Sequence, residues 1–391
     1  MINIRKIAVV GAGSMGSGIV EVATKAGCMV YVWDPNPAQE QLFKSIAKHL
    51  DKLAEKGKWD ANRSQEVLNS IQWIDRLESI PPCDLIIEAI PEKLELKVNT
   101  FQTLEAHQPE TTILASNTSS LSIAGIAGGL AKPERFLGLH FFNPAFIMPL
   151  VEVISGIATE PNLAHQMSEL MKAWGKIPVV AKDTPGFIVN RVARPFYGEA
   201  IRIFEEGIAS PEEIDQAMKT LGGFKMGPFE LMDFIGHDVN FAVTESVYAA
   251  FWNDPRYKPS FAQKRLVEAG RLGRKSGQGF YSYVDGQAQN QAVTENPQRD
   301  QRIFERILVM LMNEAIDARF WNIASAKDLD LAMTKGVNYP KGLLQWADEW
   351  GAQKVYDLML GLYQRYKEDR YRPSPLIADT LHSQTNFYNE L

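Results

Sequence analysis

Residues 5–34 constrain the fold of this chain more than any other segment, because strand-like, glycine-rich and helix-like stretches follow one another there in a specific order. A short apolar run ends at Gly11, and Gly13 and Gly16 complete a Gly-x-Gly-x-x-Gly pattern. A helix-compatible stretch follows, and a second apolar run ends at Asp34. Gly11 permits a tight strand-to-helix turn, Gly13 lets the backbone approach a pyrophosphate, and Gly16 allows close packing of helix on strand.

This βαβ unit predicts a dinucleotide site. The free amides at the helix N-terminus would face the phosphates. Asp34 can accept hydrogen bonds from both ribose hydroxyls and would repel a 2′-phosphate, which favours NAD over NADP. The expected cofactor contacts are Gly11, Ala12, Gly13, Ser14, Met15, Gly16 and Asp34. The alternative, an ordinary glycine-rich turn, is disfavoured because all parts of the motif occur in order.

The composition is that of an ordinary globular protein, and 391 residues are enough for two to three domains. A formal net charge of −6 argues against non-specific binding to nucleic acid. No apolar run approaches the roughly 18 residues of a transmembrane helix, and the first strand begins too early for a targeting segment. Cys28 and Cys83 have no metal-ligand spacing and suit a reducing compartment. We therefore expect a cytoplasmic protein with no metal site.

Strand-like runs alternate with amphipathic stretches through about residue 182, which predicts a doubly wound, mainly parallel α/β sheet of the Rossmann type. The expected strands after the βαβ unit are Asp84–Ile90, Thr112–Ser116, Phe136–Phe142, Leu150–Ile154 and Ile177–Val180. Helical patterns take over from Thr184. The expected domains are residues 1–184, a helical domain at 185–285, a polar linker at 286–301 and a second helical segment at 302–391.

The helical part contains an internal repeat with a shift of 115 positions. This shift aligns 199–201 with 314–316 and 215–218 with 330–333 without a gap. Two copies of one helical module therefore form the C-terminal half. The copies differ at Asn190, whose counterpart in the second copy is Glu305.

His140 is the candidate general base, because it alone among the six histidines ends a strand-like run, where ligand crevices form in α/β sheets. Glu152 is the only carboxylate in the next apolar run, and a buried glutamate needs a partner. Paired with His140, it would fix the imidazole tautomer and raise its basicity. A purely structural His–Glu hydrogen bond is the alternative.

Four motifs together resemble the L-3-hydroxyacyl-CoA dehydrogenase family. They are the glycine-rich turn, Asn117-Thr-Ser-Ser-Leu, Gly138-Leu-His-Phe-Phe-Asn-Pro and Asp183-Thr-Pro-Gly-Phe-Ile-Val-Asn-Arg. The resemblance covers essentially the whole chain. Within the family the chain looks most like the two-repeat branch of phenylacetate degradation, which acts on 3-hydroxyadipyl-CoA. Supporting stretches are 190–195, 238–244 and 371–373.

The resemblance implies roles for individual residues. His140 would be the base and Glu152 its orienter, while Ser119 and Asn190 would hydrogen-bond the substrate oxygen and the imidazole. Implied NAD contacts are Gly11 to Gly16, Asp34, Glu92, Lys97, Ser119, Asn143 and Lys275, and strand-end position makes an amide contact from Asn117 plausible. The alternatives are turn residues for the two asparagines, a solvated helix charge for Lys97 and a loop charge for Lys275.

Coenzyme A phosphates require local cations in an acidic protein. Lys48, Lys52, Lys56 and Lys58 cluster in the helical stretch after Asp34, and Lys52 and Lys56 are spaced to share a helix face. The resemblance points most directly to Lys56. The alternative is a solvated face balanced by neighbouring acids.

Two departures from the family pattern concern the acyl end of the site and the overall length. Residues 145–149 read Ala-Phe-Ile-Met-Pro, with a bulky Phe146 and without the usual lysine. No large segment separates the repeats, and nothing resembles an enoyl-CoA hydratase domain.

The main hypothesis is NAD-dependent oxidation of a (3S)-3-hydroxyacyl-CoA to the 3-oxoacyl-CoA. The preferred substrate is 3-hydroxyadipyl-CoA, with 3-hydroxybutyryl-CoA second. One alternative is oxidation of a free hydroxy or sugar acid, as in crystallin-like relatives. The other is a non-catalytic NAD-binding protein.

The second repeat suggests an internal replacement for a dimer partner. The resemblance implies that single-copy relatives dimerise through the helical module, so residues 302–391 would occupy the partner's place. The chain would then be a monomer. The alternative is a homodimer with a larger interface built from both copies.

Overall fold

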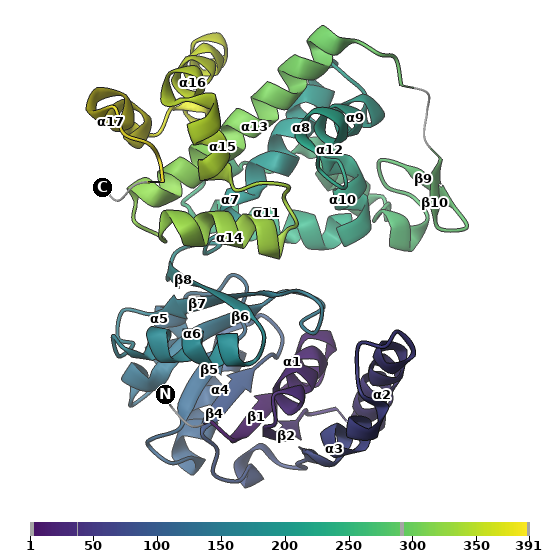
Figure 1. The fold of residues 1–391 in the computed structure, drawn as a ribbon, viewed down its shortest axis with the longest axis vertical. Helices are drawn as coiled ribbons and strands as arrows, with labels where there is room; N and C mark the ends of the chain where they lie inside the picture. The colour runs from purple at the N-terminus through teal and green to yellow at the C-terminus, as the bar shows by residue number, and fades with distance from the viewer. Residues whose placement is uncertain (1–3, 37, 290–292, 389–391) are drawn as a thin grey trace. The chain divides into compact units, whose positions relative to one another are not determined.

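The protein is described by a computed structural model that covers residues 4–36, 38–289 and 293–388, and it divides into two compact units between Phe187 and Ile188. The first unit is an eight-stranded sheet with helices on its two faces (Figure 1). Its strands are β1 Lys6–Val10, β2 Met29–Trp33, β3 Ile71–Trp73, β4 Leu85–Glu88, β5 Ile113–Ser116, β6 Phe136–Phe141, β7 Leu150–Ser155 and β8 Ile177–Lys182.

The sheet has the order β3-β2-β1-β4-β5-β6-β7-β8, and every pair is parallel except β6 with β7. Central strands such as β4 are buried at every residue, because helices cover both faces. The longer helices of this unit are α1 Ser14–Lys25, α2 Gln39–Glu55, α3 Ser64–Asn69, α4 Leu94–His107, α5 Ile123–Ala127 and α6 Leu163–Ala173. The predicted doubly wound, mainly parallel architecture is confirmed.

Strand β3 was not predicted from the sequence. It has only three residues, its central Gln72 is exposed, and it lies at the edge of the sheet, so it carries no apolar run. Its position is set by parallel pairing with β2, a contact between segments about 40 residues apart in sequence. A local pattern therefore could not reveal it.

The second unit is helical. Its helices are α7 Val189–Val192, α8 Arg194–Glu205, α9 Pro211–Gly222, α10 Pro228–Ile235, α11 His237–Ala250, α12 Phe261–Glu268, α13 Pro297–Phe320, α14 Ala326–Gly336, α15 Leu343–Trp350, α16 Ala352–Tyr366 and α17 Pro375–Ser383. The 24-residue α13 packs on α8 and α9 and on α15 and α16, so it is central to this unit (Figure 1).

The polar stretch predicted as a linker is shorter than expected. Strand β10 Gln287–Gln289 pairs antiparallel with β9 Ser282–Val284, and α13 already begins at Pro297 with Asn296 as its side-chain cap. Polar composition misled the prediction because an exposed two-stranded hairpin and a capped first helical turn are also polar. Residues 290–292 of the predicted linker lie outside the described residues.

The internal repeat is confirmed at the level of single hydrogen bonds. In the first copy the Asp215 carboxylate accepts from the amides of Phe229 and Glu230, at 2.9 and 2.8 Å. In the second copy Asp330 accepts from the amides at 344 and 345, at 2.9 and 3.0 Å, and each of these positions is shifted by 115. Both carboxylates satisfy free amides at a helix N-terminus, where negative charge is favourable.

Candidate active site

The sheet brings His140 and Glu152 directly opposite each other. They are register partners in the antiparallel β6–β7 pair, and Glu152 Oε2 lies 2.6 Å from His140 Nδ1. Both side chains are buried, with Glu152 fully enclosed. The second ring nitrogen, Nε2, is then the atom of His140 that can exchange a proton with a ligand. The two aromatic rings of Phe142 and Phe187 lie 4.5 and 6.0 Å from the imidazole and limit its rotation.

The glycine-rich turn has the geometry that its sequence requires. Gly11 has a φ of +105°, and a Cβ there would lie 2.6 Å from the Ala89 carbonyl oxygen. A Cβ on Gly16 would lie 1.8 Å from the Gly11 oxygen. At Gly13, in contrast, a Cβ would meet no protein atom within 4 Å. The packing of this chain therefore explains Gly11 and Gly16, whereas an open approach at Gly13 fits a ligand phosphate.

Asp34 also holds the glycine-rich turn in place, through hydrogen bonds to its carboxylate. Its Oδ2 accepts from the Ala12 amide at 2.7 Å and its Oδ1 accepts from the Asn36 amide at 2.8 Å. The carboxylate is half-buried at the end of β2, at the carboxyl edge of the sheet where ligands bind in α/β folds. It is thus fixed in place beside the helix N-terminus of α1.

Lys97 is buried on α4 and links two acidic side chains, so the interpretation of Lys97 as a solvated charge is wrong. Its Nζ lies 2.6 Å from Glu88 Oε1 and 3.2 Å from Glu92 Oε2. Burial raises the pKa of Glu88, although the Lys97 charge opposes this shift. For Glu92, burial acts to raise the pKa, but the charge of Lys97 and hydrogen bonds from the 118–120 loop lower it to about 2.

Glu92 organises the loop that carries Ser119. Its Oε1 accepts from the Ser119 amide at 2.9 Å and from Thr118 Oγ1 at 2.6 Å. The two asparagines of the site also make polar contacts: Asn117 Oδ1 accepts from the Phe141 amide at 2.8 Å, and Asn143 Oδ1 accepts from Ser14 Oγ at 3.2 Å. The first unit therefore brings the predicted loops after β4, β5 and β6 together at one sheet edge with the glycine-rich turn.

The predicted coenzyme A lysines lie at the end of α2. Lys52 is in its last turn and Lys56 is its C-cap residue, and both are exposed. Phe146, on the loop that departs from the family pattern, packs on the ring of His49 from the same helix with 4.0 Å between centroids. Lys176, which sequence reasoning missed, donates to the carbonyl oxygens of Ala145 and Met148 in that loop, and burial lowers its pKa to about 8.

Asn190 and Lys275 belong to the second unit. Asn190 is half-buried on α7, and Lys275 is exposed in the short helix Arg274–Ser276, where its Nζ lies 2.6 Å from Asp238 Oδ1.

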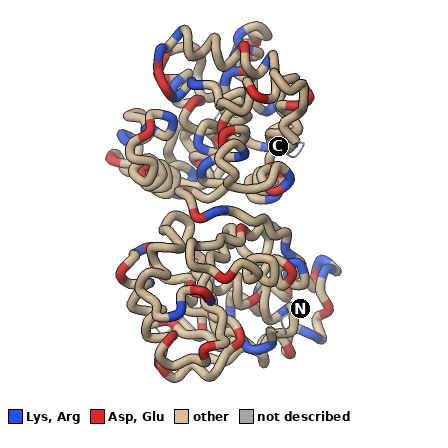
Figure 2. Tube along the Cα trace, turned by 90° about the vertical axis from the view of Figure 1, so that its left-hand side faces the viewer, with Lys and Arg blue, Asp and Glu red and all other residues tan. Residues whose placement is uncertain are grey.

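Along the chain, Lys and Arg are interspersed with Asp and Glu and do not form one large basic stretch (Figure 2). Within the described residues, no three or more His, Cys, Asp or Glu side chains are grouped to hold a metal ion. None of the described helices is both long and apolar enough to cross a membrane.

Comparison with known proteins gives a consistent result over the whole chain. Residues 6–184 match the family "3-hydroxyacyl-CoA dehydrogenase, NAD binding domain". The corresponding C-terminal domain family matches twice, at residues 186–283 and 303–386. A 3-hydroxyadipyl-CoA dehydrogenase of Escherichia coli K12 is 37% identical over 96% of this chain and 97% of its own length.

Shorter and solved relatives agree. A probable 3-hydroxybutyryl-CoA dehydrogenase of Bacillus subtilis is 44% identical over 72% of this chain and 99% of its own length. A crystal structure of 3-hydroxybutyryl-CoA dehydrogenase from Escherichia coli K12 matches with a TM-score of 0.91 at 36% identity, covering 98% of this chain and all of that one.

Proposed function

This chain belongs to the 3-hydroxyacyl-CoA dehydrogenase family, and on that premise we propose that His140 and Glu152 carry out its oxidation of (3S)-3-hydroxyacyl-CoA to 3-oxoacyl-CoA. Bound NAD supplies the hydride acceptor for the hydrogen on C3. The observation that carries the proposal is the buried His140–Glu152 contact of 2.6 Å, which leaves Nε2 of His140 to take the proton of the C3 hydroxyl.

Charge development explains the need for both groups. As the C3 hydroxyl loses its proton and C3 loses its hydride, the imidazole becomes positively charged and the substrate oxygen becomes a carbonyl oxygen. Glu152 fixes the tautomer of the neutral imidazole and stabilises the imidazolium that forms from it. Ser119 and Asn190 are proposed as hydrogen-bonding groups toward the substrate oxygen and the imidazole.

For the cofactor, we assign the phosphates to the amides of the glycine-rich turn and the ribose to Asp34. The proposed contacts are Gly11, Ala12, Gly13, Ser14, Met15, Gly16, Asp34, Glu92, Lys97, Asn117, Asn143 and Lys275. Lys97 would act mainly by fixing Glu92, since its amine already lies between two carboxylates. Lys52 and Lys56 are proposed for the phosphates of coenzyme A.

The acyl group is proposed to be 3-hydroxyadipyl, with 3-hydroxybutyryl second. Support comes from relatives that cover nearly the whole chain, although their names differ between these two substrates. A panel of C4 to C10 acyl-CoAs with and without an ω-carboxylate tests this assignment by kcat/KM. A clear preference for the C4 substrate without an ω-carboxylate would refute the assignment of a dicarboxylyl-CoA. Cytoplasmic location remains part of the proposal.

His140→Gln tests the chemistry. We expect kcat to fall by about 10²–10⁴-fold, the typical contribution of general-base catalysis, with NAD affinity unchanged. His165→Gln, at a histidine outside the proposed site, is the control. Near-wild-type turnover by the His140 variant in a folded protein would remove His140 from the mechanism. Comparison of kcat/KM for a 3-hydroxyacyl-CoA and the free 3-hydroxy acid separates the proposal from the free-acid alternative.

A further inference from the structure

Arg194, at the first position of α8, is a buried cation without a carboxylate partner. Its exposed fraction is 7%, and among the described residues it takes part in no ion pair. Its Nη1 lies 3.2 Å from Thr244 Oγ1 and 3.5 Å from the Asn240 carbonyl oxygen. Its Nε has no hydrogen-bond partner among the described residues.

Two other buried arginines of the two copies have buried carboxylate partners. Arg191 lies 2.7 Å from Glu314, and Arg306 lies 2.6 Å from Glu199. A buried guanidinium that lacks such a partner is costly, because neutral oxygen atoms replace only part of its hydration. The free Nε of Arg194 is therefore a donor that an anion would satisfy.

Among the described residues, the surroundings of Arg194 supply one further free donor and no carboxylate partner. Its guanidinium lies 4.9 Å from the ring centre of Tyr197, and the buried hydroxyl of nearby Tyr339 also has no hydrogen-bond partner among the described residues. A cavity of about 20 Å³, bordered by Arg194, Tyr197 and Thr244, has room for one small polar group. A carboxylate oxygen matches this combination of a cation, the free Tyr339 hydroxyl and a small space.

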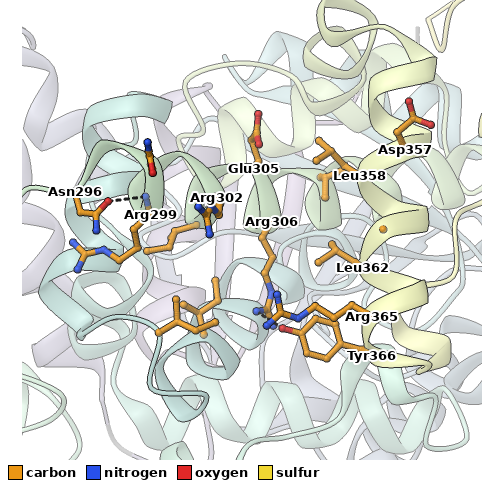
Figure 3. Close-up of a pocket in the computed structure, with 16 residues that line it drawn as sticks. Asn296, Arg299, Arg302, Glu305, Arg306, Asp357, Leu358, Leu362, Arg365 and Tyr366 are labelled. Atoms are coloured by element: carbon orange, nitrogen blue, oxygen red, sulfur yellow. Dashed lines mark hydrogen bonds between the residues drawn. The ribbon is translucent and has the colours of Figure 1, made fainter.

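The repeat indicates which way this position faces. With the shift of 115, Asn190 and Arg194 correspond to Glu305 and Val309 of α13. Both counterparts line one cavity of about 530 Å³, which α16 residues including Leu358 and Leu362 also line (Figure 3). Glu305 and Val309 thus share one side of the continuous helix α13. Asn190 lies on α7 and Arg194 starts α8, but Ala193 between them keeps right-handed helical dihedral angles, and we infer that Asn190 and Arg194 also share a side.

We propose that Arg194 binds the distal carboxylate of a dicarboxylyl-CoA substrate. This assignment depends on the proposed function, in which Asn190 contacts the oxygen on C3. Four residues of helical backbone span about 6 Å, and the Ala193 junction between α7 and α8 keeps helical dihedral angles. In a 3-hydroxyadipyl group, the second carboxylate lies three carbons beyond C3, which matches that separation. Arg194 is then a residue that determines specificity and takes no part in proton or hydride transfer.

The test compares two substrates of equal length, 3-hydroxyadipyl-CoA and 3-hydroxyhexanoyl-CoA, which differ only in the ω-carboxylate. For the wild-type enzyme we expect kcat/KM to favour the adipyl substrate by roughly 100-fold, the size of a charged hydrogen-bonded pair. Arg194→Leu should remove this preference and leave 3-hydroxyhexanoyl-CoA within about threefold. Arg194→Lys should retain part of it. Arg202→Leu, further along α8, is the matched control and should preserve the ratio.

A second measurement needs no variant. Adipyl-CoA, which lacks the reacting hydroxyl, should inhibit the wild-type enzyme roughly 100-fold more tightly than hexanoyl-CoA. Equal inhibition constants, or an Arg194→Leu variant that lowers both substrates equally, would overturn the assignment. If Arg194 binds only an inorganic anion, Arg194→Leu will leave the ratio of kcat/KM for the two substrates unchanged. That result would also overturn the assignment. Absence of turnover on every acyl-CoA would instead refute the proposed function.

Discussion

Arg191 and Glu314 form a buried ion pair between the two copies of the helical module, with 2.7 Å between Nε and Oε1. The same contact occurs in reverse, because Arg306 Nε lies 2.6 Å from Glu199 Oε1 and these residues are the counterparts of the first pair after a shift of 115. Residue i contacts j, and the counterpart of i contacts the counterpart of j. This reciprocity is the mark of a two-fold interface between identical units.

Each of these carboxylates is also held by a tyrosine. Tyr257 Oη donates to Glu314 and Tyr371 Oη donates to Glu199, and each donor–acceptor distance is 2.5 Å. Both glutamates are buried. Loss of Arg191 or Arg306 would therefore remove the nearest cation from a buried carboxylate.

Arg191→Met and Arg306→Met should each lower the free energy of unfolding by about 3–5 kcal/mol, because each removes the nearest cation of a buried carboxylate. The arginines that remain lie further away, Arg256 at 3.7 Å from Glu314 and Arg202 at 3.9 Å from Glu199. Urea titration followed by circular dichroism measures this change. Arg265→Met is the control, since its ion pair with Glu268 is exposed and should contribute about 1 kcal/mol or less. If the Arg191 and Arg306 variants lower the free energy of unfolding by only about 1 kcal/mol or less, the two ion pairs do not hold the copies together.

Acid should destabilise the first unit through Glu92. The folded-state pKa of this carboxyl is lowered to about 2 from an ordinary value of 4.5, so its stabilising contribution is complete above about pH 4.5 and is lost as the pH falls toward 2. Glu92→Gln should remove part of the pH dependence of the melting temperature in this range. Glu95→Gln, at an exposed glutamate of the same segment, is the control. Identical pH profiles for wild type and Glu92→Gln would contradict the prediction.

Asp34→Asn should weaken NAD binding and reduce the preference for NAD over NADP. The carboxylate both anchors the Ala12 amide and carries the charge that would repel a 2′-phosphate. We expect the KM for NAD to rise about tenfold or more, consistent with loss of a charged hydrogen bond. Asp84→Asn is a useful control, because Asp84 also accepts from backbone amides, of Arg5 and Lys6, but stands at the start of β4. An unchanged KM for NAD in the Asp34 variant would refute the assignment.

The sequence predicted most of the first unit because its signals are local. The glycine-rich turn, the apolar strands and the single glutamate in the run after His140 can each be recognised without knowledge of the partner segment. Antiparallel register then places His140 opposite Glu152, although a one-residue slip would have separated them.

The contacts that local sequence could not reveal, the burial of Lys97 and the role of Lys176, depend on long-range packing. Lys97 looks like a surface residue in its helix, but the fold encloses it between Glu88 and Glu92. Lys176 reaches the backbone of the 145–148 loop from about 30 positions away. No periodicity in the sequence marks such a contact, since the partner is a main-chain oxygen that every residue carries.

Truncation after Gly286 should convert the chain into a dimer or an aggregate. Removal of α13 uncovers the apolar residues of α8 and α9 on which it packs, and an exposed apolar face of this kind promotes association. The remaining first copy still carries both Arg191 and Glu199, so two truncated chains can form the two ion pairs with each other that the full chain forms internally.

Size-exclusion chromatography with light scattering distinguishes the outcomes. We expect a truncated dimer that Arg191→Glu weakens, because this change places two carboxylates in contact across the new interface. Combining Arg191→Glu with Glu199→Arg in the same truncated chain restores opposite charges and should recover the dimer. A truncated chain that stays monomeric, soluble and as stable as the full chain would show that the second copy does not replace a partner subunit.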